Sequence, residues 1–71
     1  MSDSHIERGI REFLKLQRVS GIHDLHVQAR QGVAEVWGWA DSMFLRQVCI
    51  ACCRRVTGVR QVIDHLQVAG G

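Results

Sequence analysis

The sequence predicts an α+β fold, a two-layer sandwich in which two helices cover one face of a mixed three-stranded sheet. Apolar residues recur with the period of a helix in two segments, about 4–17 and 43–56, and alternate as in strands at 25–30 and 33–40, with a third strand expected at 59–68. The order is therefore helix, strand, strand, helix, strand. A short turn makes the first two strands antiparallel, and the crossover helix makes the last two parallel.

The first helix begins at a recognisable signal. Ser4 and Glu7 have the spacing of a capping box, in which a serine caps the helix and the glutamate three residues later bonds back to it. An apolar stripe follows on one helical face and consists of Ile6, Ile10, Phe13 and Leu14. Gly21 suits the left-handed turn that ends this region.

The segment GVAEVWGWAD, residues 32–41, is central to the prediction. The turn Gln31-Gly32 joins its strand to the preceding one as a hairpin. Because side chains of a strand alternate between faces, one face is predicted to carry Leu25, Val27, Ala29, Ala34, Val36 and Ala40. The opposite, outer face is predicted to carry His26, Gln28, Arg30, Trp37 and Trp39. We interpret Gly32, Gly38 and Gly58 as structural glycines.

The second helix has an N-cap at Asp41-Ser42 and is expected to run from about Met43 to Val56, with Gly58 as the signal that stops it. Its predicted inward stripe consists of Leu45, Cys49, Cys52, Cys53 and Val56. Its remaining surface is more apolar than a helix on a single sheet requires. We expect one domain, residues 1–71, with a core of about 4–68 and a flexible tail at 69–71.

Composition excludes several classes of protein. Hydrophobic residues make up 46% and charged residues 23%, which is typical of a globular chain. The net charge of +2 is too small to indicate nucleic-acid binding. The acidic N-terminus does not resemble a signal peptide, and no apolar run is long enough to span a bilayer. An odd number of cysteines, three, favours a reducing cytoplasm over a disulfide framework.

These segments resemble the BON domain, a family named after bacterial osmotically inducible and nodulation proteins. The resemblance covers nearly the whole chain. It rests on Gly32, Val36, Gly38, Ala40, Ser42, Cys49, Cys53, the run Val56-Thr57-Gly58-Val59, Val62 and the closing Leu66-Gln67-Val68. It implies a non-enzymatic module that binds phospholipid surfaces or other ligands and supports the cell envelope. This sequence departs from the family in having two tryptophans on the outer strand face, and cysteines where alanine is common.

Trp37 and Trp39 are the strongest candidates for function, because a chain this small has nothing obvious to cover them. Tryptophan combines a large apolar surface with a polar N–H and suits a binding surface. A one-residue slip of register would instead bury both in the core. We favour a protein contact, self-association first, over phospholipid, because no basic ring surrounds the indoles. The binding residues expected on this face are Trp37, Trp39, His26, His65, Gln28 and Arg30.

Cys49, Cys52 and Cys53 support an alternative hypothesis, a metal- or redox-responsive protein. They lie in the middle of a helix, whereas a redox C-x-x-C lies at a helix N-terminus, so we favour plain core packing. His26 and His65 are weaker metal candidates and are expected to be solvated. We predict no catalytic residues and no cofactor, because the chain has no phosphate-binding glycine loop, nucleophile elbow or carboxylate pair.

Overall fold

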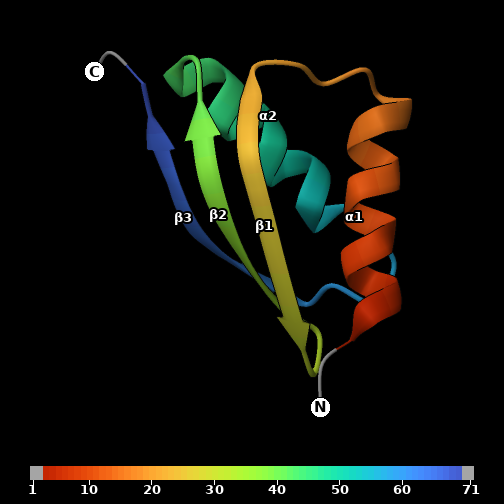
Figure 1. Ribbon diagram of the computed structural model, residues 1–71. Helices are drawn as coiled ribbons and strands as arrows, with labels where there is room; N and C mark the ends of the chain where they lie inside the picture. The colour runs from red at the N-terminus through yellow and green to blue at the C-terminus, as the bar shows by residue number, and fades with distance from the viewer. Residues whose placement is uncertain (1–2, 70–71) are drawn as a thin grey trace.

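The computed structural model describes residues 3–69 and has the predicted order of elements (Figure 1). The elements are α1 (Ser4–Leu16), β1 (Ile22–Arg30), β2 (Val33–Ala40), α2 (Met43–Arg54) and β3 (Gln61–Val68). The central strand, β2, pairs with β1 in antiparallel and with β3 in parallel orientation. The predicted α+β class and mixed three-stranded sheet are therefore confirmed.

The core lies between the two helices and the inner face of the sheet. Ile10 of α1, Val36 of β2, and Cys49 and Cys53 of α2 are fully buried in a single cluster. Ala29 and Ala34 face each other across β1 and β2, and both have no exposed surface. Small side chains at these positions let the helices approach the sheet closely, and one shared core means that both helices cover the same face.

The predicted capping box at the start of α1 is wrong. The helix begins at Ser4 itself, and Asp3 is the N-cap residue, without a side-chain capping bond. The Glu7 carboxylate instead accepts a hydrogen bond from the backbone N–H of Ala29 at 2.9 Å, and the Asp3 N–H donates to the Ala29 carbonyl at 2.7 Å. Arg11 donates to the Leu25 carbonyl at 3.0 Å. The first turns of α1 thus satisfy polar groups along the edge of β1 that would otherwise be open to another strand.

The end of α1 also differs from the prediction. Arg18, with φ +54°, is the left-handed residue next to the helix, and the Val19 N–H bonds back to the Leu14 carbonyl at 3.0 Å. Gly21 has a positive φ as expected, but its role is at the start of β1, where its carbonyl accepts from the Asp41 N–H at 2.8 Å.

The two ends of the β1–β2 hairpin have different backbone features. Gln31 and Gly32 both have positive φ, +53° and +80°, which is the type I′ turn of a two-residue hairpin. At the other end a β-bulge interrupts the ladder, because Asp24 and Leu25 together lie opposite Gly38. Beyond the bulge the pairing resumes, so β1 begins at Ile22, three residues before the predicted start.

The second helix begins as predicted, since the Ser42 hydroxyl accepts a hydrogen bond from the Leu45 N–H at 3.2 Å. It ends at Arg54 rather than at 56, because the N–H groups of Arg55 and Val56 bond to carbonyls only three residues back. β3 then begins at Gln61 rather than at 59.

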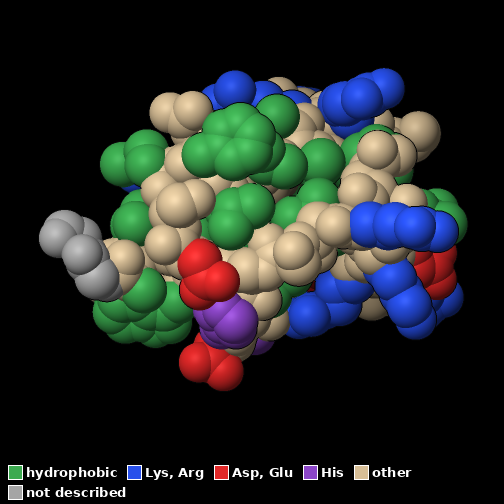
Figure 2. All heavy atoms as spheres, turned by 90° about the horizontal axis from the view of Figure 1, so that it is seen from above, with side chains coloured by type: hydrophobic (Ala, Val, Ile, Leu, Met, Phe, Trp, Pro, Cys, Tyr) green, Lys and Arg blue, Asp and Glu red, His purple; other side chains and the backbone are tan. Residues whose placement is uncertain are grey.

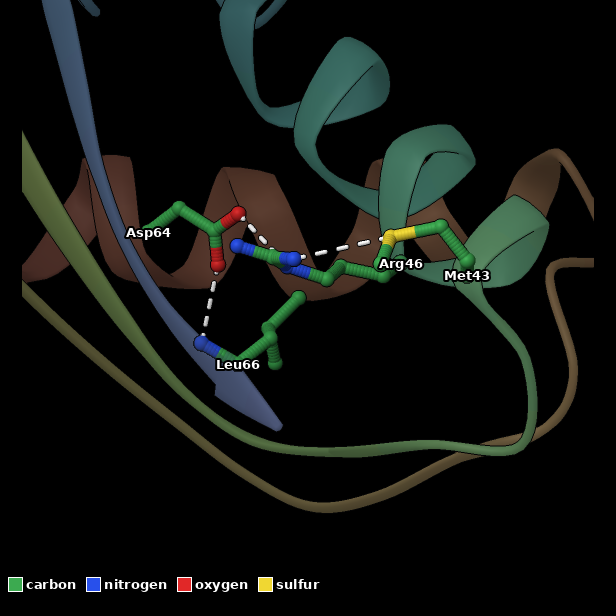
Figure 3. A network of polar contacts seen from close by, with 4 residues as sticks. All are labelled: Met43, Arg46, Asp64 and Leu66. Carbon is green, nitrogen blue, oxygen red and sulfur yellow. Dashed lines mark hydrogen bonds and ion pairs between the residues drawn. The ribbon is translucent and has the colours of Figure 1, made fainter. Parts of the chain in front are cut away.

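An ion pair links α2 to the edge of β3. Asp64 is an acidic residue on the inner side of the strand, and its carboxylate lies 2.9 Å from Arg46 Nε and accepts from the Leu66 N–H at 2.8 Å (Figure 3). Arg46 also contacts the Met43 sulfur at 3.5 Å. By occupying an edge N–H and placing a charge at the edge strand, Asp64 opposes the addition of a further strand.

The tail predicted for residues 69–71 lies mostly outside the described residues. At Ala69 the N–H still bonds to the Ala40 carbonyl at 2.9 Å. Within residues 3–69 no helix has both the length and the apolar character needed to cross a bilayer.

Candidate binding surface

The side of the sheet that faces away from the helices is here called the outer sheet face. Strand alternation and register place twelve side chains on it: His23, His26, Gln28 and Arg30 from β1, Val33, Glu35, Trp37 and Trp39 from β2, and Gln61, Ile63, His65 and Gln67 from β3. Within the described residues, neither helix lies over this face (Figure 1). All six binding residues expected from the sequence therefore lie on one uncovered surface.

Trp37 is at the centre of the outer sheet face and lies between two histidines. Its ring is stacked on that of His65, with centroids 4.9 Å apart and 11° between the planes, and it contacts His26 at 5.3 Å in a tilted arrangement. The three residues are direct neighbours across the sheet. His65 is held in turn by Glu35, with 2.9 Å between Nε2 and Oε2. These contacts leave Trp37 half-buried and order its ring in advance of any ligand.

Trp39 is the more exposed tryptophan and lies near the end of β2. Its side chain is 43% exposed. It pairs with His23, whose Nε2 lies 2.8 Å from an Asp41 carboxylate oxygen. Figure 2 looks onto this end of the molecule and shows hydrophobic side chains gathered there, with a histidine beside acidic groups at the border. Trp39 is therefore an exposed apolar group that borders the polar His23–Asp41 pair.

His23 belongs to this surface, which the sequence analysis did not predict. Residues 23 and 26 have opposite parity and would lie on opposite faces of a regular strand. The bulge at Asp24, where φ is +54°, adds a residue to the strand and so shifts the alternation of side chains between the two faces. Both histidines therefore lie on the outer sheet face. The available signal was Ile22, an apolar residue whose even number does not fit the odd-numbered inner set of the same strand.

At the hairpin end, the outer sheet face contains an open hollow of about 400 Å³. Gln28, Arg30, Gln31, Val33 and Glu35 line it. Gln28 and Arg30 thus share one hollow, although they lie far from Trp39. Neither the hollow nor the lining role of Glu35 was predicted from the sequence.

The cysteines are placed as the packing interpretation predicts. Cys49 and Cys53 have no exposed surface, Cys52 is partly exposed, and all three are free thiols. A hydrogen bond to Cys49 and burial raise the pKa of Cys53, and burial also raises the pKa of Cys52, whereas the hydrogen bond from Cys53 lowers the pKa of Cys49. The raised pKa values keep Cys52 and Cys53 protonated, whereas metal ligands and nucleophiles are thiolates. Among residues 3–69 no three His, Cys, Asp or Glu side chains are grouped closely enough to hold a metal ion.

Gly38 has a structural reason to be glycine. Its φ is +146°, and a Cβ built on it would lie 2.8 Å from the His23 carbonyl oxygen and 3.3 Å from the Asp24 carbonyl oxygen. Only a residue without a side chain fits under the bulge. Gly32 and Gly58 also have positive φ, at the hairpin turn and in the loop before β3.

Comparison with protein families identifies this arrangement. A family model described as the BON domain matches residues 2–70, which is nearly the whole chain. The chain belongs to the BON domain family. BON domains are small binding modules for phospholipids or proteins, and the family is non-catalytic in type. No curated protein matches the chain.

Proposed function

We propose that this BON domain is a non-catalytic module that binds protein through its outer sheet face, with a second copy of the same chain as the partner. The observation that carries the proposal is the pair of tryptophans on an uncovered sheet face, one ordered between two histidines and one 43% exposed. Tryptophan is enriched at the energetic centres of protein interfaces, where it fills pockets and excludes water.

The charges around the tryptophans favour protein over a phospholipid surface. Each tryptophan has a carboxylate nearby. Glu35 lies 2.9 Å from His65, which stacks on Trp37. Asp41 lies 2.8 Å from His23, which pairs with Trp39. Arg30 is the only Lys or Arg among the twelve side chains that the described strands place on the outer sheet face. Elements that bind anionic membranes carry several cations around their apolar residues. The free cysteines agree with the reducing cytoplasm expected from the sequence.

Intrinsic fluorescence tests the proposal. Trp37→Phe leaves only Trp39 as a reporter, and Trp39→Phe leaves only Trp37. We expect Trp39 emission to be blue-shifted and protected from acrylamide at high protein concentration and to redden on dilution, with sedimentation showing the change of mass. Phospholipid vesicles, anionic or neutral, are expected to have no effect.

Two results would contradict the proposal. Emission that is red and quenchable at every concentration, and turns blue only with vesicles, would establish lipid binding instead. A chain that sediments as a monomer at every concentration, with no spectral change, would exclude self-association through this face.

A further inference from the structure

From the positions of Trp39 and the hollow we infer how two copies meet: face to face about a two-fold axis that lies in the plane between the two outer sheet faces and runs perpendicular to β2, with Trp39 of each copy seated in the hollow of the other. This inference rests on the proposed self-association and specifies its geometry. It identifies Trp39 and the lining of the hollow as two halves of one contact.

The first argument is that the exposed Trp39 and the hollow lie at opposite ends of the same face. Trp39 is near the end of β2, whereas Val33, which lines the hollow, is its first residue. Six residues of strand separate the two by about 20 Å. A two-fold axis that lies between the two sheets, over the middle of β2 and perpendicular to it, turns the outer faces toward each other, reverses the strand direction and places each Trp39 over the partner's hollow. Self-complementary contacts of this kind, made twice, define an isologous interface.

The second argument is the chemistry of the hollow. Arg30 and Glu35 are on its rim, and an indole ring with one N–H needs such a lining. The guanidinium of Arg30 can lie against the indole face as a cation–π contact. The carboxylate of Glu35 accepts a hydrogen bond from His65 through Oε2, and its two oxygens have further lone pairs that can accept the indole N–H. Gln28 supplies a further polar group.

The third argument is the distribution of charge along the sheet. Arg30 and Arg60 are exposed at the hairpin end, and Asp24 and Asp41 are exposed at the opposite end. Strands that run antiparallel across the interface bring unlike charges together. A parallel arrangement would place arginine against arginine and aspartate against aspartate, which is unfavourable. The cluster of Trp37 with His26 and His65 then lies near the axis and meets its own copy.

Complementation between two variants tests this geometry. Trp39→Ala removes the projecting side chain but keeps the hollow, and Gln28→Tyr fills the hollow but keeps Trp39. We expect each variant alone to associate at least tenfold more weakly than the wild-type chain in sedimentation equilibrium. An equimolar mixture restores one of the two contacts, so it is expected to associate at least tenfold more tightly than either variant alone.

Three controls accompany the mixture. Phe44→Ala removes an aromatic side chain that is 70% exposed on α2, and it is expected to leave association unchanged. Arg30→Glu replaces Gln28→Tyr as the blocked partner if the tyrosine variant does not fold, as judged by far-UV circular dichroism. Arg8→Glu, the same charge reversal at an exposed position of α1, is its matched control and is expected to have no effect.

The outcomes separate the two proposals. A wild-type chain that dimerises while the mixture associates no better than its components would overturn the two-fold geometry and leave self-association standing. Variants that associate as tightly as the wild type would overturn it as well. A wild-type chain that remains monomeric would refute the proposed function itself, and with it the geometry.

Discussion

Replacement of Gly38 by alanine tests the most constrained point of the fold. A Cβ at this position would lie 2.8 Å from the His23 carbonyl oxygen, 3.3 Å from the Asp24 carbonyl oxygen and 3.3 Å from the Leu25 Cα. All three atoms belong to the backbone of the bulge, so they cannot move aside as the end of a flexible side chain does. The φ of +146° adds strain, because side chains of L-residues rarely tolerate it.

The magnitude follows from these two effects. A residue held in an unfavourable region of φ and ψ costs of order 1–3 kcal/mol. Forcing an extra methyl group against a packed backbone costs about 1–3 kcal/mol more. We therefore expect Gly38→Ala to lower the free energy of unfolding by about 2–6 kcal/mol. A domain of 71 residues has a total stability of about 4–10 kcal/mol, so the loss is a large fraction of it.

The assay is urea unfolding followed by far-UV circular dichroism, at one protein concentration for all variants. Gly9→Ala is the matched control, because its Cβ would meet only the Val56 side chain, at 3.3 Å, and alanine favours the helix by up to about 1 kcal/mol. The control is expected to stay within about 1 kcal/mol of the wild type. If Gly38→Ala is as stable as Gly9→Ala, the bulge does not require glycine and the reasoning is wrong.

Two further predictions concern the edge of β3 and the thiols. Asp64→Ala is expected to lower the free energy of unfolding by about 1–2 kcal/mol, because it removes both the ion pair with Arg46 and the acceptor for the Leu66 N–H. Asp64→Asn keeps an acceptor and is expected to restore part of the loss. Equal urea midpoints for the alanine variant and the wild type would contradict this. The pKa of Cys53 is raised above the ordinary 9.0, so the unfolded chain loses this proton first as pH rises. Its contribution to stability is therefore intact at neutral pH and is lost above about pH 9, by up to about 1.4 kcal/mol per pH unit. Urea unfolding of reduced protein at pH 7–10 should show this fall in the free energy of unfolding, and the fall should be smaller for Cys53→Ala. In a separate experiment, a thiol reagent at neutral pH should react with Cys49 and Cys53 only when the chain unfolds. Rapid labelling of both thiols in the folded chain would refute their assigned burial.

Much of the sheet could be predicted because strand alternation is a local property. The alternation around Val36 assigned inner and outer residues correctly, and the pairing of Val27 with Val36 and of Ala29 with Ala34 confirms the register. The turn at Gln31-Gly32 followed from residue types that tolerate positive φ. The buried residues Ile6, Ile10 and Leu14 of α1 were predicted for the same reason, since burial repeats with the period of the backbone. In α2 the prediction held for Cys49 and Cys53, but Ile50, which the predicted stripe did not include, is buried as well.

The errors occurred where a non-local partner overrides a local pattern. Ser4 and Glu7 fit a capping box, but the Glu7 carboxylate bonds to Ala29, 22 residues away, where an edge N–H would otherwise be open. Arg18 adopts the left-handed conformation that glycine was expected to provide, because the chain must turn there toward the sheet. Neither partner is visible in a window of neighbouring residues.

The sequence by itself determined the order of elements, the apolar face of each strand and the presence of two tryptophans on the polar side. Only the tertiary structure decided what surrounds those tryptophans. The bulge opposite Gly38 brings His23 to the outer sheet face, the register places Trp37 between His26 and His65, and the hairpin end leaves a hollow beside Arg30. These features depend on atoms brought together from separate strands, and periodicity along one segment carries no information about them.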